Sequence, residues 1–227
     1  MRLIETPSPN HGPRVGDRPL DLLVLHYTGM RSAGEALARL CDPQAEVSAH
    51  YTVDTDGTVH AHVPEHRRAW HAGAGEWQGA GDVNSRSIGI EIVNPGHELG
   101  LAPFPEPQVA AVIVLCQAIM ARHGIPAVNV VGHSDVAPGR KADPGELFPW
   151  AQLARAGIGL WPDGGAEPAD PAEALTAIGY GVGAYGLGAC LRAFQRRYRP
   201  ARIDGRADGE TLLRLGQLLR RTRASLS

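Results

Sequence analysis

The sequence has 227 residues, enough for one large domain or for a full-sized domain joined to a small one. Its formal net charge of −2 gives no overall basic field, so we expect no nucleic-acid partner. We also expect no membrane span, because no apolar run is long enough. The opening segment lacks the apolar stretch of a signal peptide, which predicts a cytoplasmic location; a periplasmic or outer-membrane-anchored protein is the alternative if an export signal was removed.

Strands and helices are predicted to alternate through residues 1–162. Apolar or alternating stretches predict strands at 20–28, 47–63 (a hairpin), 87–94 and 126–133. Helices are expected at 32–41, where Ser32 and Glu35 have capping-box spacing, and at 106–124, which has a proline in its first turn and ends at a glycine. This alternation predicts an α/β domain with a mixed central β-sheet flanked by helices.

The composition changes towards the C-terminus. Residues 163–170 are rich in Gly, Pro and Asp, the make-up of a linker. Residues 171–227 then show helical spacing of apolar residues, interrupted by Gly-rich turns. We therefore expect a small C-terminal three-helix domain, near the lower size limit for independent folding.

Ionisable residues occur within or just after the predicted strands of the first domain. His26 and His133 end two strands, Glu91 interrupts a third, and Asp143 lies in the loop after His133. Strand ends can converge in space, and two imidazoles with a carboxylate and one open position form a catalytic zinc site. Each histidine taken alone is more often a hydrogen-bonded surface residue, so the hypothesis depends on their coming together.

Other histidines compete for a functional role. His60 and His62 lie on one face of a hairpin strand and could chelate a metal, although such alternating strands are usually just half exposed. His50 and His71 lie beside aromatic residues and glycines, a setting suited to the lining of a cleft.

Lys141 is the only lysine in a sequence that otherwise uses arginine. A lysine ammonium is a compact point charge that can be aimed at one atom, whereas a guanidinium is a flat fork. The alternative is a surface lysine that occurs there by chance.

Five ordered motifs resemble the zinc-dependent N-acetylmuramoyl-L-alanine amidases of the type 2 amidase family, which share a fold with peptidoglycan recognition proteins. The motifs are LVLHYT, VSAHYTVDTDG, AWHAG, SIGIEIVN and GHSDVAPGRKADPGELFPW, within residues 15–162. The tail resembles a peptidoglycan-binding domain through LRAFQRRYRP and IDGRADGETLLRL, although its first Gly-rich turn lacks the usual Thr.

The resemblance implies a role for each matching residue. It implies one Zn²⁺ per chain held by His26, His133 and Asp143, with Glu91 as the catalytic carboxylate and Lys141 steadying the reacting oxygen. It places the substrate beside four further residues: His50, Trp70, His71 and Asn94. The implied reaction is hydrolysis of the amide between N-acetylmuramic acid, or its anhydro form, and L-alanine in peptidoglycan or muropeptides.

Two other functions and two roles for the tail stay open at this point. A muropeptide sensor would hold the same ligand without cutting it, and a zinc peptidase would cut the stem peptide instead. The C-terminal helices either bind glycan or pack on the catalytic domain as a structural support. We expect the protein to act as a monomer.

Overall fold

The computed structural model describes residues 2–16 and 19–226. Its strands are β1 (Leu3–Glu5), β2 (His11–Gly12), β3 (Leu22–Tyr27), β4 (Tyr51–Val53), β5 (Val59–Ala61), β6 (Arg68–Ala69), β7 (Ser87–Ile92) and β8 (Val130–Gly132). The helices of the first part are α1 (Ala33–Cys41), α2 (Val83–Arg86), α3 (Gly96–Leu99), α4 (Glu106–His123), the 3₁₀ turn η1 (Ala127–Asn129), α5 (His133–Val136) and α6 (Trp150–Arg155). The C-terminal helices are α7 (Pro171–Ile178), α8 (Val182–Tyr185), α9 (Leu187–Tyr198) and α10 (Gly209–Leu226).

Six strands form a mixed sheet in the order β1-β5-β4-β7-β3-β8, and β2 pairs with β6 in a small second sheet. All neighbouring pairs of the large sheet are parallel except the antiparallel pair of β4 and β5. Strands β3 and β7 are apolar over most of their length because both faces of the sheet are covered at this point. Helix α4 covers one face, and on the other Leu22 and Val24 share a core cluster with Ala72 and Trp77 of the segment before α2. The predicted mixed α/β sheet flanked by helices is confirmed.

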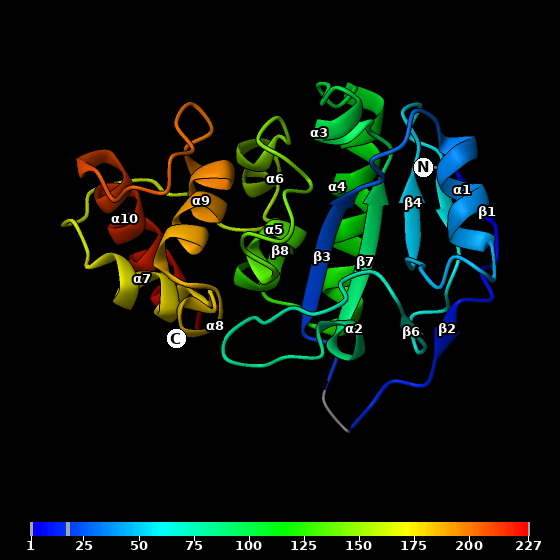
Figure 1. Ribbon diagram of the computed structural model, residues 1–227, viewed down its shortest axis with the longest axis horizontal. Helices are drawn as coiled ribbons and strands as arrows, with labels where there is room; N and C mark the ends of the chain where they lie inside the picture. Colours follow the sequence, from blue (N-terminus) through cyan, green and yellow to red (C-terminus); the bar gives the residue numbers. More distant parts are fainter. Residues whose placement is uncertain (1, 17–18, 227) are drawn as a thin grey trace.

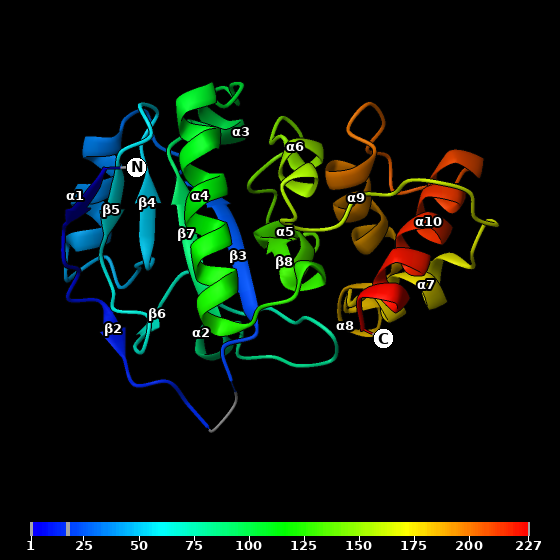
Figure 2. The same cartoon turned by 180° about the vertical axis from the view of Figure 1, so that it is seen from behind.

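Helix α4 packs along one face of the sheet, which is seen from that side in Figure 2. Its buried residues, including Val112, Leu115 and Ile119, join Leu23, Ile90 and other side chains of the sheet in one core. The helix begins after Pro105 and ends at Gly124, whose positive φ of 66° suits a glycine at a helix end. Both features agree with the sequence pattern.

The C-terminal helices lie beyond β8 and α5, at the far end of the molecule from β1 (Figure 1). They contain the three predicted helices and, in addition, the four-residue helix α8. They share a second core with the other side of β3 and β8: Leu22, Val24 and Val131 cluster with Leu175 and Phe194. The apolar residues of the tail are therefore buried against the sheet domain as well as against one another.

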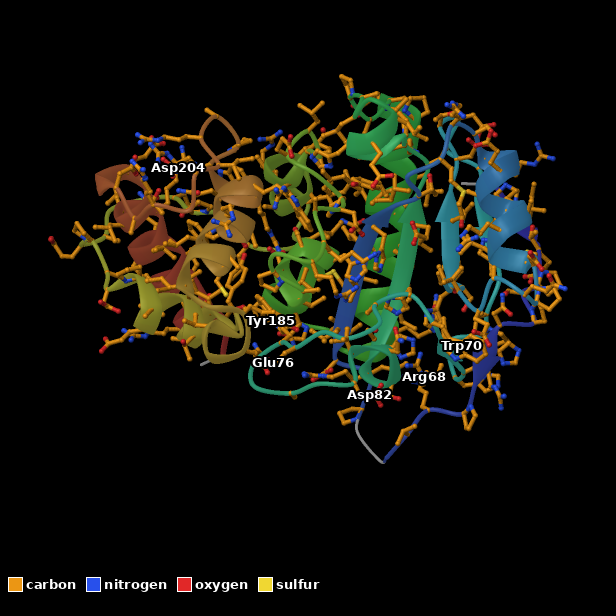
Figure 3. The ribbon with its side chains drawn as sticks, in the orientation of Figure 1. Arg68, Trp70, Glu76, Asp82, Tyr185 and Asp204 are labelled. Carbon is orange, nitrogen blue, oxygen red and sulfur yellow. The ribbon has the colours of Figure 1, made fainter. Side chains whose placement is uncertain are left out.

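Two irregular segments contact the C-terminal helices. Residues 163–170 contain no helix or strand and lie along α10, where the side chains of Gln217 and Arg220 donate to the carbonyls of Gly164 and Asp163. On the other side, the loop before α2 reaches under α8, where Glu76 lies near Tyr185 (Figure 3). Within residues 2–16 and 19–226, no helix is long and apolar enough to cross a membrane.

Candidate active site

The sheet brings His26, Glu91 and His133 to one edge. His26 and Glu91 are directly paired across the parallel strands β3 and β7. His133 follows β8, whose last residue Gly132 is paired with Leu25, the residue before His26. Because parallel strands end on the same side of a sheet, these three polar residues meet although the chain separates them widely.

Asp143 completes a compact triangle with the two histidines. The Nδ1 atoms of His26 and His133 lie 2.9 Å apart, and each lies 3.0 Å from Oδ2 of Asp143. Ligand atoms around a tetrahedral zinc ion, with bonds of about 2.0–2.1 Å, are roughly 3.3 Å apart. The three residues are buried, and their spacing and chemistry fit a single metal ion.

The hydrogen bond of His133 on the side away from Asp143 determines which of its ring nitrogens has a lone pair for a metal ion. Nε2 of His133 lies 2.9 Å from the carbonyl oxygen of Ala72, which can only accept. The proton of the neutral ring is therefore on Nε2, and the lone pair of Nδ1 points towards Asp143. A carboxylate oxygen facing an imidazole lone pair needs a cation between them.

Burial lowers the pKa of His26 to about 4, and the nearby His133 adds to the effect. A histidine with this pKa is neutral at pH 7, the form that binds metal ions. The donor set is thus two imidazoles, of which that of His26 is neutral, and one carboxylate.

Glu91 lies beside this triangle with an unusual environment. Its Oε2 atom is buried and has no hydrogen-bond partner among the described residues. Burial raises the pKa of Glu91 well above its usual value, the charge of Asp143 raises it further, and Lys141 opposes the shift. A buried carboxyl group whose pKa is raised by its surroundings and that lies beside a metal-binding site is suited to proton transfer.

Two adjacent cations on the loop after α5 are used differently. Arg140 donates to the carbonyl of Ala72 at 2.7 Å and also to that of Ala74, so its guanidinium is engaged with the protein. Lys141 is exposed and lines the cleft, and its ammonium forms no ion pair with any residue that the structure describes. The lysine charge is therefore available to a ligand.

A cleft of about 540 Å³ opens over the triangle. Its walls include Trp70 and His71 of the predicted substrate-binding residues, and Trp70 is marked in Figure 3 just after β6. His50 and Asn94 lie behind the wall. His50 accepts from the backbone N–H of Gly89 at 3.0 Å, and the side chain of Asn94 holds the loop between Gly96 and Ala102. These positions lend no support to contact of His50 or Asn94 with a substrate.

His60 and His62, the other candidate metal ligands, form hydrogen bonds within the protein. The Nδ1 atom of His62 is 2.7 Å from the carbonyl of Thr6, and its Nε2 atom is 2.8 Å from the hydroxyl of Thr52. His60 meets the hydroxyl of Thr6. Among the described residues, the only group of three or more potential metal ligands is His26, His133 and Asp143.

Two residues that shape the site, Gly89 and Asn84, have no functional role implied by the sequence motifs. A side chain at Gly89 would place its Cβ only 2.4 Å from the ring of His71, so the glycine makes room for that ring. Asn84 accepts hydrogen bonds from the backbone N–H groups of His71 and Ala72. Glycine inside a buried strand was the one available signal, since it often marks the close approach of another group.

Comparison with known proteins agrees with this geometry. Residues 16–146 match the family model Amidase_2, described as N-acetylmuramoyl-L-alanine amidase. The chain is 40% identical over 223 residues to N-acetylmuramoyl-L-alanine amidase AmiD of Escherichia coli, covering 85% of this chain and 79% of AmiD. It is 34% identical to 1,6-anhydro-N-acetylmuramyl-L-alanine amidase AmpD of Enterobacter cloacae, over 65% of this chain and 86% of AmpD.

Two solved structures with bound ligands are also similar. E. coli AmiD in complex with anhydro-N-acetylmuramic acid-L-Ala-D-gamma-Glu-L-Lys gives a TM-score of 0.81 at 38% identity and covers 92% of this chain and 91% of that one. AMPDH3 of Pseudomonas aeruginosa in complex with anhydromuramic pentapeptide gives 0.78 at 32% identity, covering 89% and 92%. The family match, the identity and the shared fold lead to one conclusion: the chain belongs to the N-acetylmuramoyl-L-alanine amidase family.

Proposed function

We propose that the protein is a zinc-dependent amidase that hydrolyses the bond between N-acetylmuramic acid, or its anhydro form, and L-alanine in muropeptides. The observation that carries the proposal is the convergence of His26, His133 and Asp143 beside Glu91 in one open cleft. Membership of the amidase family supports the reaction, and the ligands of the two similar structures support the substrate class. Cell-wall turnover and recycling is the process that such a reaction serves.

The two histidines and Asp143 would hold the zinc ion. The Nε2 atoms of the histidines, on the side away from the triangle, contact the protein. Zinc supplies Lewis acidity in such a site: it polarises the amide carbonyl and lowers the pKa of water towards neutrality. Two uncharged nitrogen ligands and one carboxylate leave a net positive charge at a zinc site, which favours the developing negative charge of amide hydrolysis.

Glu91 is proposed as the group that moves the proton. It takes a proton from the attacking water and delivers it to the nitrogen of L-alanine as the amide bond breaks. The charge of Asp143 raises the pKa of Glu91 and that of Lys141 lowers it, and a cation at the triangle would lower it further. The carboxylate form needed to accept the first proton is thereby favoured.

Lys141 is proposed to stabilise the oxyanion. Its side chain lines the same cleft as Glu91 and the metal-binding triangle, and its charge is not committed to another described residue. An ammonium directed at the oxygen stabilises the negative charge as it forms, which is when it contributes to the rate. Trp70 on the cleft wall offers an apolar ring surface to the substrate.

Removal and return of zinc tests the proposal. The metal-free protein should cleave no soluble anhydromuropeptide, and one equivalent of Zn²⁺ should restore the activity. A metal-free protein that keeps full activity would contradict the zinc-dependent mechanism. A zinc-loaded protein that binds the muropeptide without product formation would identify a sensor.

A further inference from the structure

Two consecutive residues, His71 and Ala72, contact the outer nitrogens of both proposed metal-binding histidines. Nε2 of His26 lies 3.0 Å from Nδ1 of His71, and Nε2 of His133 lies 2.9 Å from the carbonyl oxygen of Ala72. The cleft wall after β6 thus reaches both rings from the side opposite the triangle. The direction of each hydrogen bond determines which nitrogen of each ring can bind a metal.

The direction of the hydrogen bond at His71 follows from a series of hydrogen bonds that ends on a backbone carbonyl. The hydroxyl of Ser87 is 2.5 Å from the carbonyl oxygen of Val83, so it donates its single proton there. Its oxygen can then only accept, and Nε2 of His71, at 3.1 Å, must be the donor. In the neutral ring this leaves Nδ1 of His71 as an acceptor.

The acceptor on His71 in turn fixes the proton of His26. Because Nδ1 of His71 accepts, Nε2 of His26 must carry a proton and donate it. The lone pair of His26 is then on Nδ1, the atom that faces His133 and Asp143. The series of hydrogen bonds from Val83 through Ser87 and His71 therefore selects the tautomer of His26 that can bind a metal inside the triangle.

The segment is itself held in place. Oδ1 of Asn84, on α2, accepts from the N–H groups of His71 at 3.2 Å and Ala72 at 2.8 Å. Gly89 leaves the space in β7 that the His71 ring occupies. Asn84 thus fixes the backbone of residues 71–72, and Gly89 allows the His71 ring to lie against β7 within reach of His26.

We propose that residues 71–72, anchored by Asn84, fix the tautomers of His26 and His133 so that both Nδ1 atoms are directed at the metal. His71 and Asn84 are positioning residues in this account. Both ring nitrogens of His71 are used by Ser87 and His26, which leaves it no free polar atom for a substrate. The inference rests on the proposed function, because it assumes that the triangle binds zinc.

The test compares zinc affinity among variants by competition with a chelator. His71→Leu removes the acceptor and should weaken zinc binding by about 10–100-fold. His71→Asn should stay close to the wild-type affinity, since Oδ1 of asparagine takes the place of Nδ1. Asn84→Ala should weaken binding less than His71→Leu. His62→Leu is the control, because His62 is a buried histidine whose ring bonds only to Thr6 and Thr52.

A second measurement needs no variant. In the zinc-loaded wild-type protein, ¹⁵N NMR of the histidine rings should show protons on Nε2 of His26, His71 and His133. A proton on Nδ1 of His71, or wild-type zinc affinity in a folded His71→Leu variant with only KM altered, would overturn the inference and make His71 a substrate contact. Failure of the wild-type protein to bind zinc would overturn the proposed function as well.

Discussion

Arg197 of α9 and Asp135 of α5 form an ion pair of 2.7 Å in which both side chains are almost completely buried. Asp135 also accepts from the hydroxyl of Tyr180 at 2.7 Å and from the N–H of Gly132 at 2.8 Å. It lies two residues after His133 on the same short helix. The C-terminal helices therefore hold the helix that begins with a proposed zinc ligand.

Arg197→Met should lower the free energy of unfolding by about 3–5 kcal/mol, because it leaves the charge of Asp135 buried without its partner. It also removes the contact of the guanidinium with the ring of Trp150, at 3.8 Å. Denaturant unfolding measures the loss. The control is Arg202→Ala: Arg202 is 51% exposed and pairs with Asp204 and Asp208, so it should cost about 1 kcal/mol or less. Equal effects of the two variants would contradict this assignment.

Deletion of residues 165–227 should reduce activity on soluble muropeptide and on intact sacculi alike. The deletion would remove Leu175, Phe194 and their neighbours from the core cluster in which Leu22, Val24 and Val131 of the sheet are fully buried. We therefore propose that the tail supports the catalytic part, the second of the two roles considered for it. A truncated protein that keeps activity on soluble muropeptide and loses it only on sacculi would instead indicate a glycan-binding tail.

Glu91→Gln should retain one zinc per chain and lose activity by at least about a hundredfold. The amide has nearly the shape of the carboxylate but cannot accept the proton of the attacking water. Zinc content and turnover are measured on the same preparation. Loss of zinc together with activity would mean that Glu91 is a ligand and would require the ligand set to be revised.

Lys141→Ala should lower kcat by about a hundredfold or more with a smaller change in KM, since the charge acts most strongly as the oxyanion develops. Lys141→Arg should also impair catalysis, because the guanidinium charge is spread over a plane and prefers paired oxygens. Steady-state kinetics on a soluble muropeptide measures both variants. A fully active Lys141→Arg enzyme would leave the lone lysine without a specific role.

Acid should destabilise the protein through His50. Burial lowers the pKa of His50 to about 3, so the folded state keeps this ring neutral while the unfolded chain binds a proton below about pH 6.5. Stability from this group is complete above pH 6.5 and falls as the pH drops towards the folded pKa, by about 2 kcal/mol between pH 7 and 5. Unfolding of metal-free protein at several pH values should show a shallower loss for His50→Asn, which keeps an acceptor for Gly89. An equal loss of stability with falling pH in the wild-type protein and the His50→Asn variant would contradict the role given to His50.

Much of the fold could be predicted because local signals were strong. Apolar runs marked β3 and β7, and a proline and a glycine marked the two ends of α4. Ser32 accepts from the N–H of Glu35, as the capping spacing indicated. The short strands β1, β2 and β6 escaped notice because two or three residues carry too little periodicity to be recognised.

The site was predictable only in part. His26 lies near the end of one strand, His133 follows another, and Asp143 lies in the loop after His133; that placement together with the family motifs suggested their convergence. The contacts of His71 with His26 and Ser87, and of Arg197 with Asp135, join residues far apart in the chain and leave no local pattern. Linker boundaries, monomeric state and cellular location stay predictions.

The bond that is cut is the central claim, and hydrolysis in ¹⁸O-labelled water tests it most directly. Zinc-loaded protein should convert an anhydromuropeptide into anhydro-N-acetylmuramic acid with one ¹⁸O in its lactyl carboxylate and an unlabelled peptide that begins with L-alanine, as read by mass spectrometry. Glu91→Gln should give neither product. Label in a carboxylate of the stem peptide, with the lactyl amide intact, would contradict the amidase assignment and identify a peptidase.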